Sequence, residues 1–272
     1  MFSSEKLGPA DAAILETFVV PRYLHLFGEL ALEMLSSGPE ARLLHVGCRT
    51  GYPDQKFYER IDDAEILGID SSLAVLELAR HKVAVRGTTG IDYRILDALP
   101  GGLDAGSFTH AVCLHPIVSD AQRAELFATL RWLLCSGGQA LTALPLRGSF
   151  QEIADLLREY ALKHEEAEFG KRLEASLSAR PSLETLSEQL EDAGFEDVDI
   201  EVRHTSIVFD GGRAFFEDPV SRLLILPEVR SWLPGEDLQH PLEYVREALD
   251  KYFSEGRLDL SLNVGCASSR CP

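Results

Sequence analysis

The stretch LLHVGCRTG, residues 43–51, joins an apolar run to a turn that contains Gly47 and Gly51. An apolar strand that ends in a glycine turn is typical of a nucleotide-binding α/β fold, because the backbone approaches the ligand closely there. Arg49 lies between the two glycines, where such a site usually needs bare backbone. The stretch therefore predicts a ligand-binding turn that carries one unexpected side chain.

Short apolar runs alternate with helical patterns on the carboxyl side of this turn. Segment 71–87 begins with serines that suit a helix cap, and segment 120–138 is an amphipathic helix that a glycine pair closes. Such alternation implies right-handed crossovers and a mainly parallel sheet. The strands are expected at 41–47, 64–70, 91–99, 108–117 and 139–146.

The pattern loosens beyond residue 147. A long charged helical region is expected over 149–178, and strands are expected over 196–209 and 258–268. Because no break in composition marks a boundary, we expect one domain over residues 1–272. Within it we expect an N-terminal helical lid (1–38), a nucleotide-binding core (40–146) and an elaborated C-terminal half (147–272).

The composition limits the function classes. With a net charge of −18 and a pI near 4.8, the chain is disfavoured as a nucleic-acid or anionic-membrane binder, since both need clustered Lys and Arg. No segment has the length and apolarity of a membrane span, and the N-terminus has no export signal. The five cysteines match no zinc pattern. A cytoplasmic, reduced protein is the expectation.

Several segments together resemble the class I S-adenosylmethionine-dependent methyltransferases, and the quinone C-methyltransferases and malonyl-carrier methyltransferases in particular. The resemblance implies a Rossmann-like, seven-stranded, mainly parallel sheet with helices on both faces and a late antiparallel strand. It also implies S-adenosylmethionine or S-adenosylhomocysteine as cofactor and a small-molecule or carrier-bound acceptor. The segments are LLHVGCRTG, ILGIDSSLAVLELAR, ILDALPGGLDAGSFTHAVCLHPI, LRWLLCSGGQALTAL, SLETLSEQLEDAGFEDVDIEV and YFSEGRLDLSLNVGCAS.

The resemblance places the adenosine end of the cofactor beside two acids. Asp70, followed by Ser71, stands where the family holds the ribose, and two carboxylate oxygens suit a diol. Asp97 matches the acid that receives the adenine amino group, and Ala98 packs near the ring. The alternatives are a helix-capping role for Asp70 and an ordinary turn role for Asp97.

The methionine end departs from the family pattern. His45 replaces an acid, Arg49 replaces the middle glycine of the set that includes Gly47 and Gly51, and Thr109 replaces an aspartate. The first two exchanges predict about two extra positive charges beside a cofactor that is itself cationic. The alternative for His45 is a core histidine with satisfied hydrogen bonds.

Two functions remain open from the sequence. One is a working methyltransferase in which His115 acts as a base and Phe215, Phe216 and Trp232 enclose an apolar acceptor. The other is a pseudoenzyme, a binding or scaffolding protein with a protein partner, whose pocket is empty or takes an anionic adenosine compound. For the second function the cofactor pocket is altered or empty, and no cofactor is expected.

Overall fold

The structure is a computed structural model that describes residues 7–38, 40–233, 238–253 and 256–272. The contacts of its backbone divide it into two compact units. Unit 1 comprises residues 1–144, 183–202 and 265–272, and unit 2 comprises residues 145–182 and 203–264. The single domain that the composition suggests stays a prediction.

A seven-stranded sheet with the order β3-β2-β1-β4-β5-β7-β6 organises the chain. The pairs β3-β2, β2-β1, β1-β4 and β4-β5 are parallel, so β1 lies between two parallel neighbours. The strands that the sequence predicts are all present. They are β1 (Arg42–Val46), β2 (Glu65–Asp70), β3 (Ile91–Ile95), β4 (Phe108–Leu114), β5 (Leu134–Pro145), β6 (Glu196–Phe209) and β7 (Leu258–Arg270).

The last strand, β7, runs antiparallel to β5, as predicted. Backbone hydrogen bonds join the beginning of β5 to the end of β7 (Gly137 N to Cys271 O, 2.7 Å). Further along, they join the residue after β5 to the middle of β7 (Leu146 N to Asn263 O, 2.8 Å). The sheet is therefore mixed, with one antiparallel strand inserted between β5 and β6.

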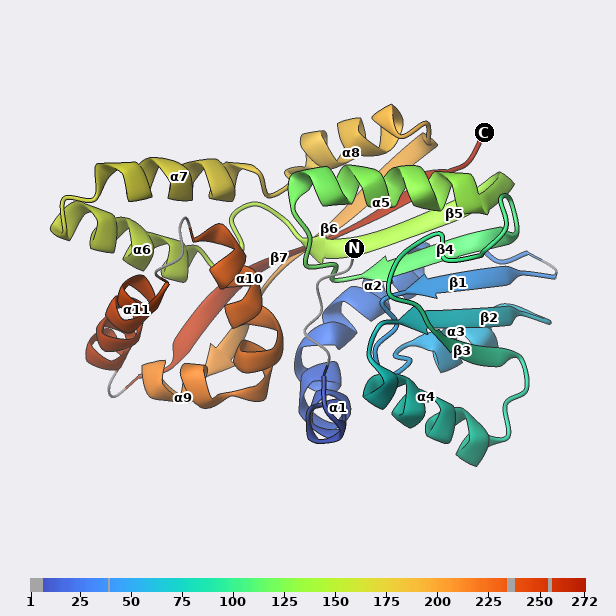
Figure 1. Ribbon diagram of the computed structural model, residues 1–272, viewed down its shortest axis with the longest axis horizontal. Coiled ribbons are helices and arrows are strands. Elements are labelled where there is room, and N and C mark those ends of the chain that lie inside the picture. Colours follow the sequence, from blue (N-terminus) through green and yellow to red (C-terminus); the bar gives the residue numbers. More distant parts are fainter. Residues whose placement is uncertain (1–6, 39, 234–237, 254–255) are drawn as a thin grey trace. The chain divides into compact units, whose positions relative to one another are not determined.

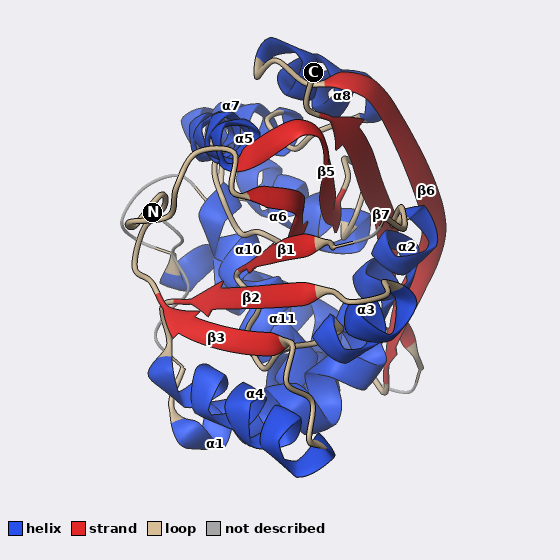
Figure 2. Ribbon diagram, turned by 90° about the vertical axis from the view of Figure 1, so that its right-hand side faces the viewer, coloured by secondary structure: helices blue, strands red, loops and turns tan. Residues whose placement is uncertain are grey.

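The helices of unit 1 cover both faces of its strands. In Figure 1, α5 and α8 lie on one side of the strands and α4 on the other, and Figure 2 shows α3 beside the parallel strands. The N-terminal segment is helical, with Pro21 inside a π-helical stretch. The bounds are α1 (Pro9–Ile14), η1 (Leu15–Leu24), α2 (His25–Met34), α3 (Asp54–Arg60), α4 (Leu73–Arg86), α5 (Asp120–Leu133) and α8 (Leu183–Asp192).

Two helix boundaries differ from the predictions. The glycine pair at 137–138 does not close α5, because the chain is already extended at Leu134, where β5 begins. The charged region 149–178 is two helices and not one, since the chain breaks at residues 164–166, where Glu165 has a φ of +58°. Residues with high helix propensity lie on both sides of the break, so the sequence pattern predicts one continuous helix and does not indicate the turn.

Unit 2 is built from helices that pack on one another and on parts of β6 and β7. Helix α11 packs against α6 and α9. No helix of the described residues has the length and apolarity needed to cross a membrane. The bounds are α6 (Gln151–Lys163), α7 (Ala167–Ser178), α9 (Gly212–Glu217), η2 (Ser221–Ile225), α10 (Leu226–Trp232) and α11 (Gln239–Tyr252).

The contact of α9 with α11 depends on a missing side chain. A Cβ atom at Gly212 would lie 2.3 Å from the backbone carbon of Leu249. We therefore expect Gly212→Ala to lower the free energy of unfolding by about 1–3 kcal/mol, the usual cost of overpacking. Gly170→Ala is the control, because Gly170 lies inside α7 and its Cβ would make an ordinary 3.5 Å contact with Ala161 of α6. It should raise stability by about 0.5–1 kcal/mol in urea unfolding. Equal effects of the two substitutions would contradict this account.

Candidate cofactor site at the carboxyl edge of the sheet

The predicted site residues gather where β1, β2 and β4 end. Parallel strands place their carboxyl ends at one edge of the sheet, which is where ligands bind in open α/β folds. The loop after β1 is fixed to β2, because the backbone N–H groups of Gly47 and Cys48 both donate to Ile69 O (2.9 and 3.0 Å). Gly47 has a φ of +66°, and a Cβ there would meet no atom within 4 Å. Gly51, with a φ of +75°, is instead packed under the Tyr93 hydroxyl.

Arg49 lies between these glycines with a φ of +50° and is half-buried. Its guanidinium turns toward the end of β4, where Nη1 donates to Leu114 O and Nη2 donates to His115 O, both at 2.9 Å. Burial lowers the pKa of Arg49, and the Asp70 carboxylate opposes that shift. The side chain remains a cation at neutral pH, since an arginine pKa lies far above 7. Arg49 therefore joins the glycine loop to the neighbouring strand with a positive charge.

Asp70 is 8 % exposed, and both of its carboxylate oxygens are engaged by backbone. Oδ2 accepts from Arg49 N at 3.1 Å and Oδ1 accepts from Ser72 N at 2.9 Å. Ser71 is also buried, and Ser72 Oγ donates to Leu7 O at 3.0 Å, so the N-terminal segment lies beside this acid. These contacts suit the capping alternative, and a carboxylate still has lone pairs for a ribose. The ribose role stays a prediction.

Asp97 and Ala98 lie in an exposed bend two residues beyond β3. Ile95, the last residue of β3, pairs in register with Asp70, so Asp97 emerges at the same edge of the sheet as Asp70. The two acids that the resemblance assigns to ribose and adenine therefore end neighbouring strands. Their roles in binding remain predictions.

His45 does not add a positive charge to this edge. Its Nδ1 lies 2.5 Å from Asp54 Oδ1, and both side chains are buried. His45 thus lies against a carboxylate, and the added cation that faces this edge is Arg49. The sequence analysis missed Asp54; the available signal was an acid in the first turn of the helix that follows the glycine loop.

Thr109 also lies outside the site. It stands near the amino end of β4, where its hydroxyl accepts from Arg42 N at 2.9 Å. That end of the strand is opposite to the edge at which Arg49 and Asp70 meet. The exchange at position 109 therefore bears on the start of the sheet and not on the cofactor.

His115 is fully buried, with a φ of +50°. Its Nε2 lies 2.7 Å from the hydroxyl of Tyr23, and its ring packs edge-on against Phe27 with centroids 5.0 Å apart. The η1 and α2 helices thus close over the end of β4. An acceptor would reach this imidazole only after Tyr23 moved, so the role of His115 as a base stays a prediction.

The two ends of the site differ in how well they fit the cofactor that the resemblance implies. At the adenosine end, two acids and an open face at Gly47 suit a nucleoside. At the methionine end, the carbonyl groups of Leu114 and His115 would suit an ammonium, but the Arg49 guanidinium already occupies them. In this conformation the residues fit adenosine and do not fit the cationic tail.

Residues 43–138 match a family model described as a methyltransferase domain. The matched residues run from β1 to the beginning of β5. No curated protein matches the sequence.

Among solved structures, the fold is similar to that of three proteins with low sequence identity. A Haemonchus contortus phosphoethanolamine N-methyltransferase 2, solved with phosphomonomethylethanolamine and S-adenosylhomocysteine, has a TM-score of 0.59 and 15 % identity, covering 98 % of this chain and 59 % of that one. A putative methyltransferase from Bacillus halodurans has a TM-score of 0.58 and 16 % identity, and the match covers 90 % of this chain and 98 % of that one. The [4+2]-cyclase SpnF has a TM-score of 0.53 and 17 % identity, and the match covers 91 % of this chain and 80 % of that one. The fold is that of the class I methyltransferases.

The buried pair of His45 and Asp54 gives a stability prediction for this domain. His45→Ala should lower the free energy of unfolding by about 3–5 kcal/mol, because it leaves the Asp54 carboxylate buried without its partner. Replacing both residues by leucine should recover most of that loss, since no buried charge remains. Urea unfolding of the three proteins tests this. A double variant as unstable as the single one would show that the pair itself, and not the orphaned acid, determines stability.

Proposed function

We propose that this protein is a non-catalytic methyltransferase-fold protein that binds an uncharged or anionic adenosine compound. The observation that supports this most is the Arg49 guanidinium, which donates to Leu114 O and His115 O from the middle of the glycine loop. It supplies a cation and N–H donors where the cofactor's ammonium would need acceptors. The protein thus carries in its own chain a substitute for the charged tail of S-adenosylmethionine.

The charges favour this function over methyl transfer. S-adenosylmethionine brings a sulfonium and an ammonium against one carboxylate. One unfavourable charge near 4 Å costs roughly 1–4 kcal/mol, depending on screening. That cost corresponds to about one to three orders of magnitude in affinity. The Asp54 carboxylate does not offset Arg49, because it is already paired with His45.

The adenosine end supports the class of ligand. Asp70 and Asp97 end adjacent strands, and Gly47 leaves the backbone open to a ligand. A nucleoside without a cationic tail, such as methylthioadenosine, would use these groups and avoid the Arg49 charge. Adenosine monophosphate would add a phosphate that a guanidinium attracts.

A working methyltransferase is the second candidate function, and the half-buried state of Arg49 favours it. A side chain with access to solvent can turn away from the Leu114 and His115 carbonyl groups when a cofactor arrives. The family match over residues 43–138 supports this candidate as well. The two candidates differ in whether Arg49 opposes or tolerates S-adenosylmethionine.

Titration calorimetry of the whole chain distinguishes them. We expect methylthioadenosine and adenosine monophosphate to bind at least about tenfold more tightly than S-adenosylmethionine, a difference of about 1.4 kcal/mol. Tight S-adenosylmethionine binding by the unaltered chain would overturn the proposal in favour of the working enzyme.

Arg49→Gly should tighten S-adenosylmethionine binding at least about tenfold, because it removes the charge and frees two carbonyl acceptors. Position 49 already has a positive φ, so glycine suits its backbone. Arg49→Met is the matched control, which removes the charge and keeps much of the volume. If both variants bind tightly, charge is the barrier, and if only the glycine variant does, volume is. Weaker binding in both would make Arg49 a ligand of the cofactor and contradict the proposal.

Asp70→Ala should weaken binding of methylthioadenosine by about 1–3 kcal/mol, the scale of a lost charge-assisted hydrogen bond. Glu77→Ala, an exposed acid on α4, makes the same change in charge and should leave the affinity within about twofold. Circular dichroism checks that both variants are folded. Unchanged affinity in Asp70→Ala would remove this residue from the site and leave it as a helix cap.

A further inference from the structure

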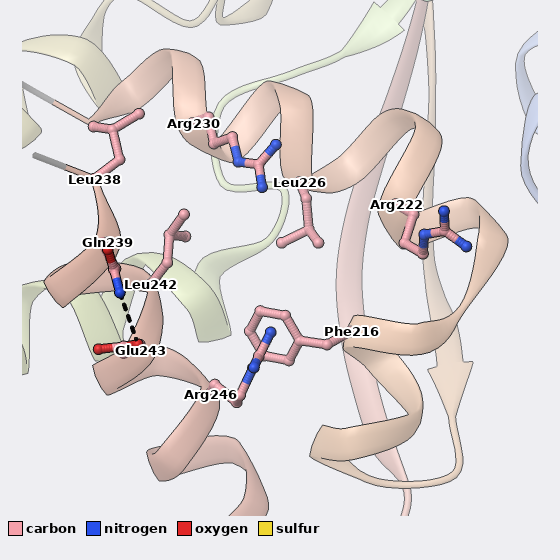
Figure 3. Close-up of a pocket in the computed structure, with 9 residues that line it drawn as sticks. All are labelled: Phe216, Arg222, Leu226, Arg230, Leu238, Gln239, Leu242, Glu243 and Arg246. Atoms are coloured by element: carbon pink, nitrogen blue, oxygen red, sulfur yellow. Dashed lines mark hydrogen bonds between the residues drawn. The ribbon is translucent and has the colours of Figure 1, made fainter. Parts of the chain in front are cut away.

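A cavity of about 500 Å³ lies within unit 2, among helices α9, η2, α10 and α11. Figure 3 shows that its side chains come from two sides, with Leu226 on α10 and Leu242 on α11 directed toward the space between them. Phe216 on α9 closes a third side. Its volume is in the range of about 300–1,000 Å³ that small-molecule sites occupy.

Three arginines from three different elements line this cavity. They are Arg222 on η2, Arg230 on α10 and Arg246 on α11. Within the described ranges, none of the three makes an ion pair with a carboxylate, and Arg246 lies 4.9 Å from the centroid of the Phe216 ring. Glu243, the acid among the described lining residues, accepts from Gln239 Nε2 at 3.2 Å. The lining side chains therefore carry a net charge of about +2 at neutral pH.

This charge contrasts with the rest of the chain. The protein has a net charge of −18, so acids are abundant as partners. Other arginines of unit 2 use them: Arg158 pairs with Glu174 at 2.6 Å, Arg180 with Glu228 at 2.6 Å and Arg213 with Glu217 at 3.1 Å. Among the described residues, the three guanidinium groups around the cavity have no carboxylate partner, whereas these neighbouring ones do.

The walls between the arginines are apolar. Leu226 is buried, and Phe216 and Leu242 are half-buried at the cavity surface. Of the aromatic residues that the sequence suggests for an acceptor site, Phe216 lines this cavity. Phe215 and Trp232 are instead buried in the packing of unit 2, against Phe209 and Phe150. Apolar walls with cationic groups at the rim suit a ligand that has both kinds of surface.

We propose that this cavity binds a small amphiphile with a phosphate or carboxylate head and an apolar body. The guanidinium groups of Arg222, Arg230 and Arg246 would hold the head, because their planar N–H forks match both oxyanions. The apolar body would lie against Phe216, Leu226 and Leu242. This site is built from unit 2 residues and does not depend on what the Arg49 loop binds.

Three probes distinguish the contribution of the anionic head to binding from that of the apolar body. Octyl phosphate, octanol and inorganic phosphate are titrated into the full chain by calorimetry at low and moderate salt. We expect octyl phosphate to bind at least about tenfold more tightly than either octanol or inorganic phosphate, and its affinity to fall as salt rises. Octanoate in place of octyl phosphate then tells a phosphate site from a general oxyanion site.

Substitutions in the lining test whether octyl phosphate binds in this cavity. Arg230→Gln and the double variant Arg230→Gln with Arg222→Gln remove charges from exposed side chains that make no ion pair in the described structure. The single variant should weaken octyl phosphate binding by at least about threefold, and the double variant by at least about tenfold. Arg213→Gln is the matched control, since it makes the same change in unit 2 outside the lining. It should change the affinity less than twofold, and thermal unfolding checks that all variants are folded.

Three results would overturn the proposal. Equal octyl phosphate affinity in the double variant and in Arg213→Gln would place the binding elsewhere. Octanol as tight as octyl phosphate would show an apolar surface without anion recognition. Absence of octyl phosphate binding would leave the arginines as a surface for another class of partner, such as an acidic polypeptide. Arg49→Gly should leave octyl phosphate affinity unchanged, so this test and that of the adenosine site fail independently.

Discussion

The bridge from Arg49 to the carbonyl groups at the end of β4 joins two neighbouring strand ends at the carboxyl edge of the sheet. Strand ends in a parallel sheet present backbone carbonyl groups without partners, and these need donors. In a ligand-binding protein of this fold, the ligand can supply them. Here a side chain of the glycine loop does so, and the loop, β4 and the helix that carries Tyr23 become one connected structure. The chain's own side chains thereby hold this edge together.

At position 45 the carboxylate expected on β1 is supplied by a residue of another element. The acid expected on β1 is absent, but Asp54 at the start of α3 brings a carboxylate to the same buried place. The imidazole Nδ1 and the carboxylate Oδ1 are hydrogen-bonded to one another, a partner that a lone acid in this position would lack. A carboxylate thus remains near β1, but its contact with His45 reduces the hydrogen bonding that it could offer to a ligand.

The sequence predicts the fold well because period and order are properties of the backbone. The seven strands and the antiparallel β7 follow from apolar runs, alternation and the position of turns. The site was predicted less well, because contacts between distant residues decide it. The sequence places Arg49 in the loop, but not the direction of its side chain. It marks His45 as unusual, but its partner Asp54 lies nine residues away and on another element. It places Thr109 near the start of its strand, but not the contact that Thr109 makes there with Arg42 N.

The φ of +50° at Arg49 has a consequence for how this loop could change over evolution. The backbone at this position keeps the left-handed conformation that glycine adopts without cost, although an arginine now occupies it. The backbone of the loop thus has a glycine-like conformation at position 49, while the arginine side chain bonds to the end of the neighbouring strand. Arginine and glycine codons can differ by one base. Under the function that we propose, a single mutation would therefore open the site to S-adenosylmethionine, and the φ at position 49 means that the backbone would not need to change.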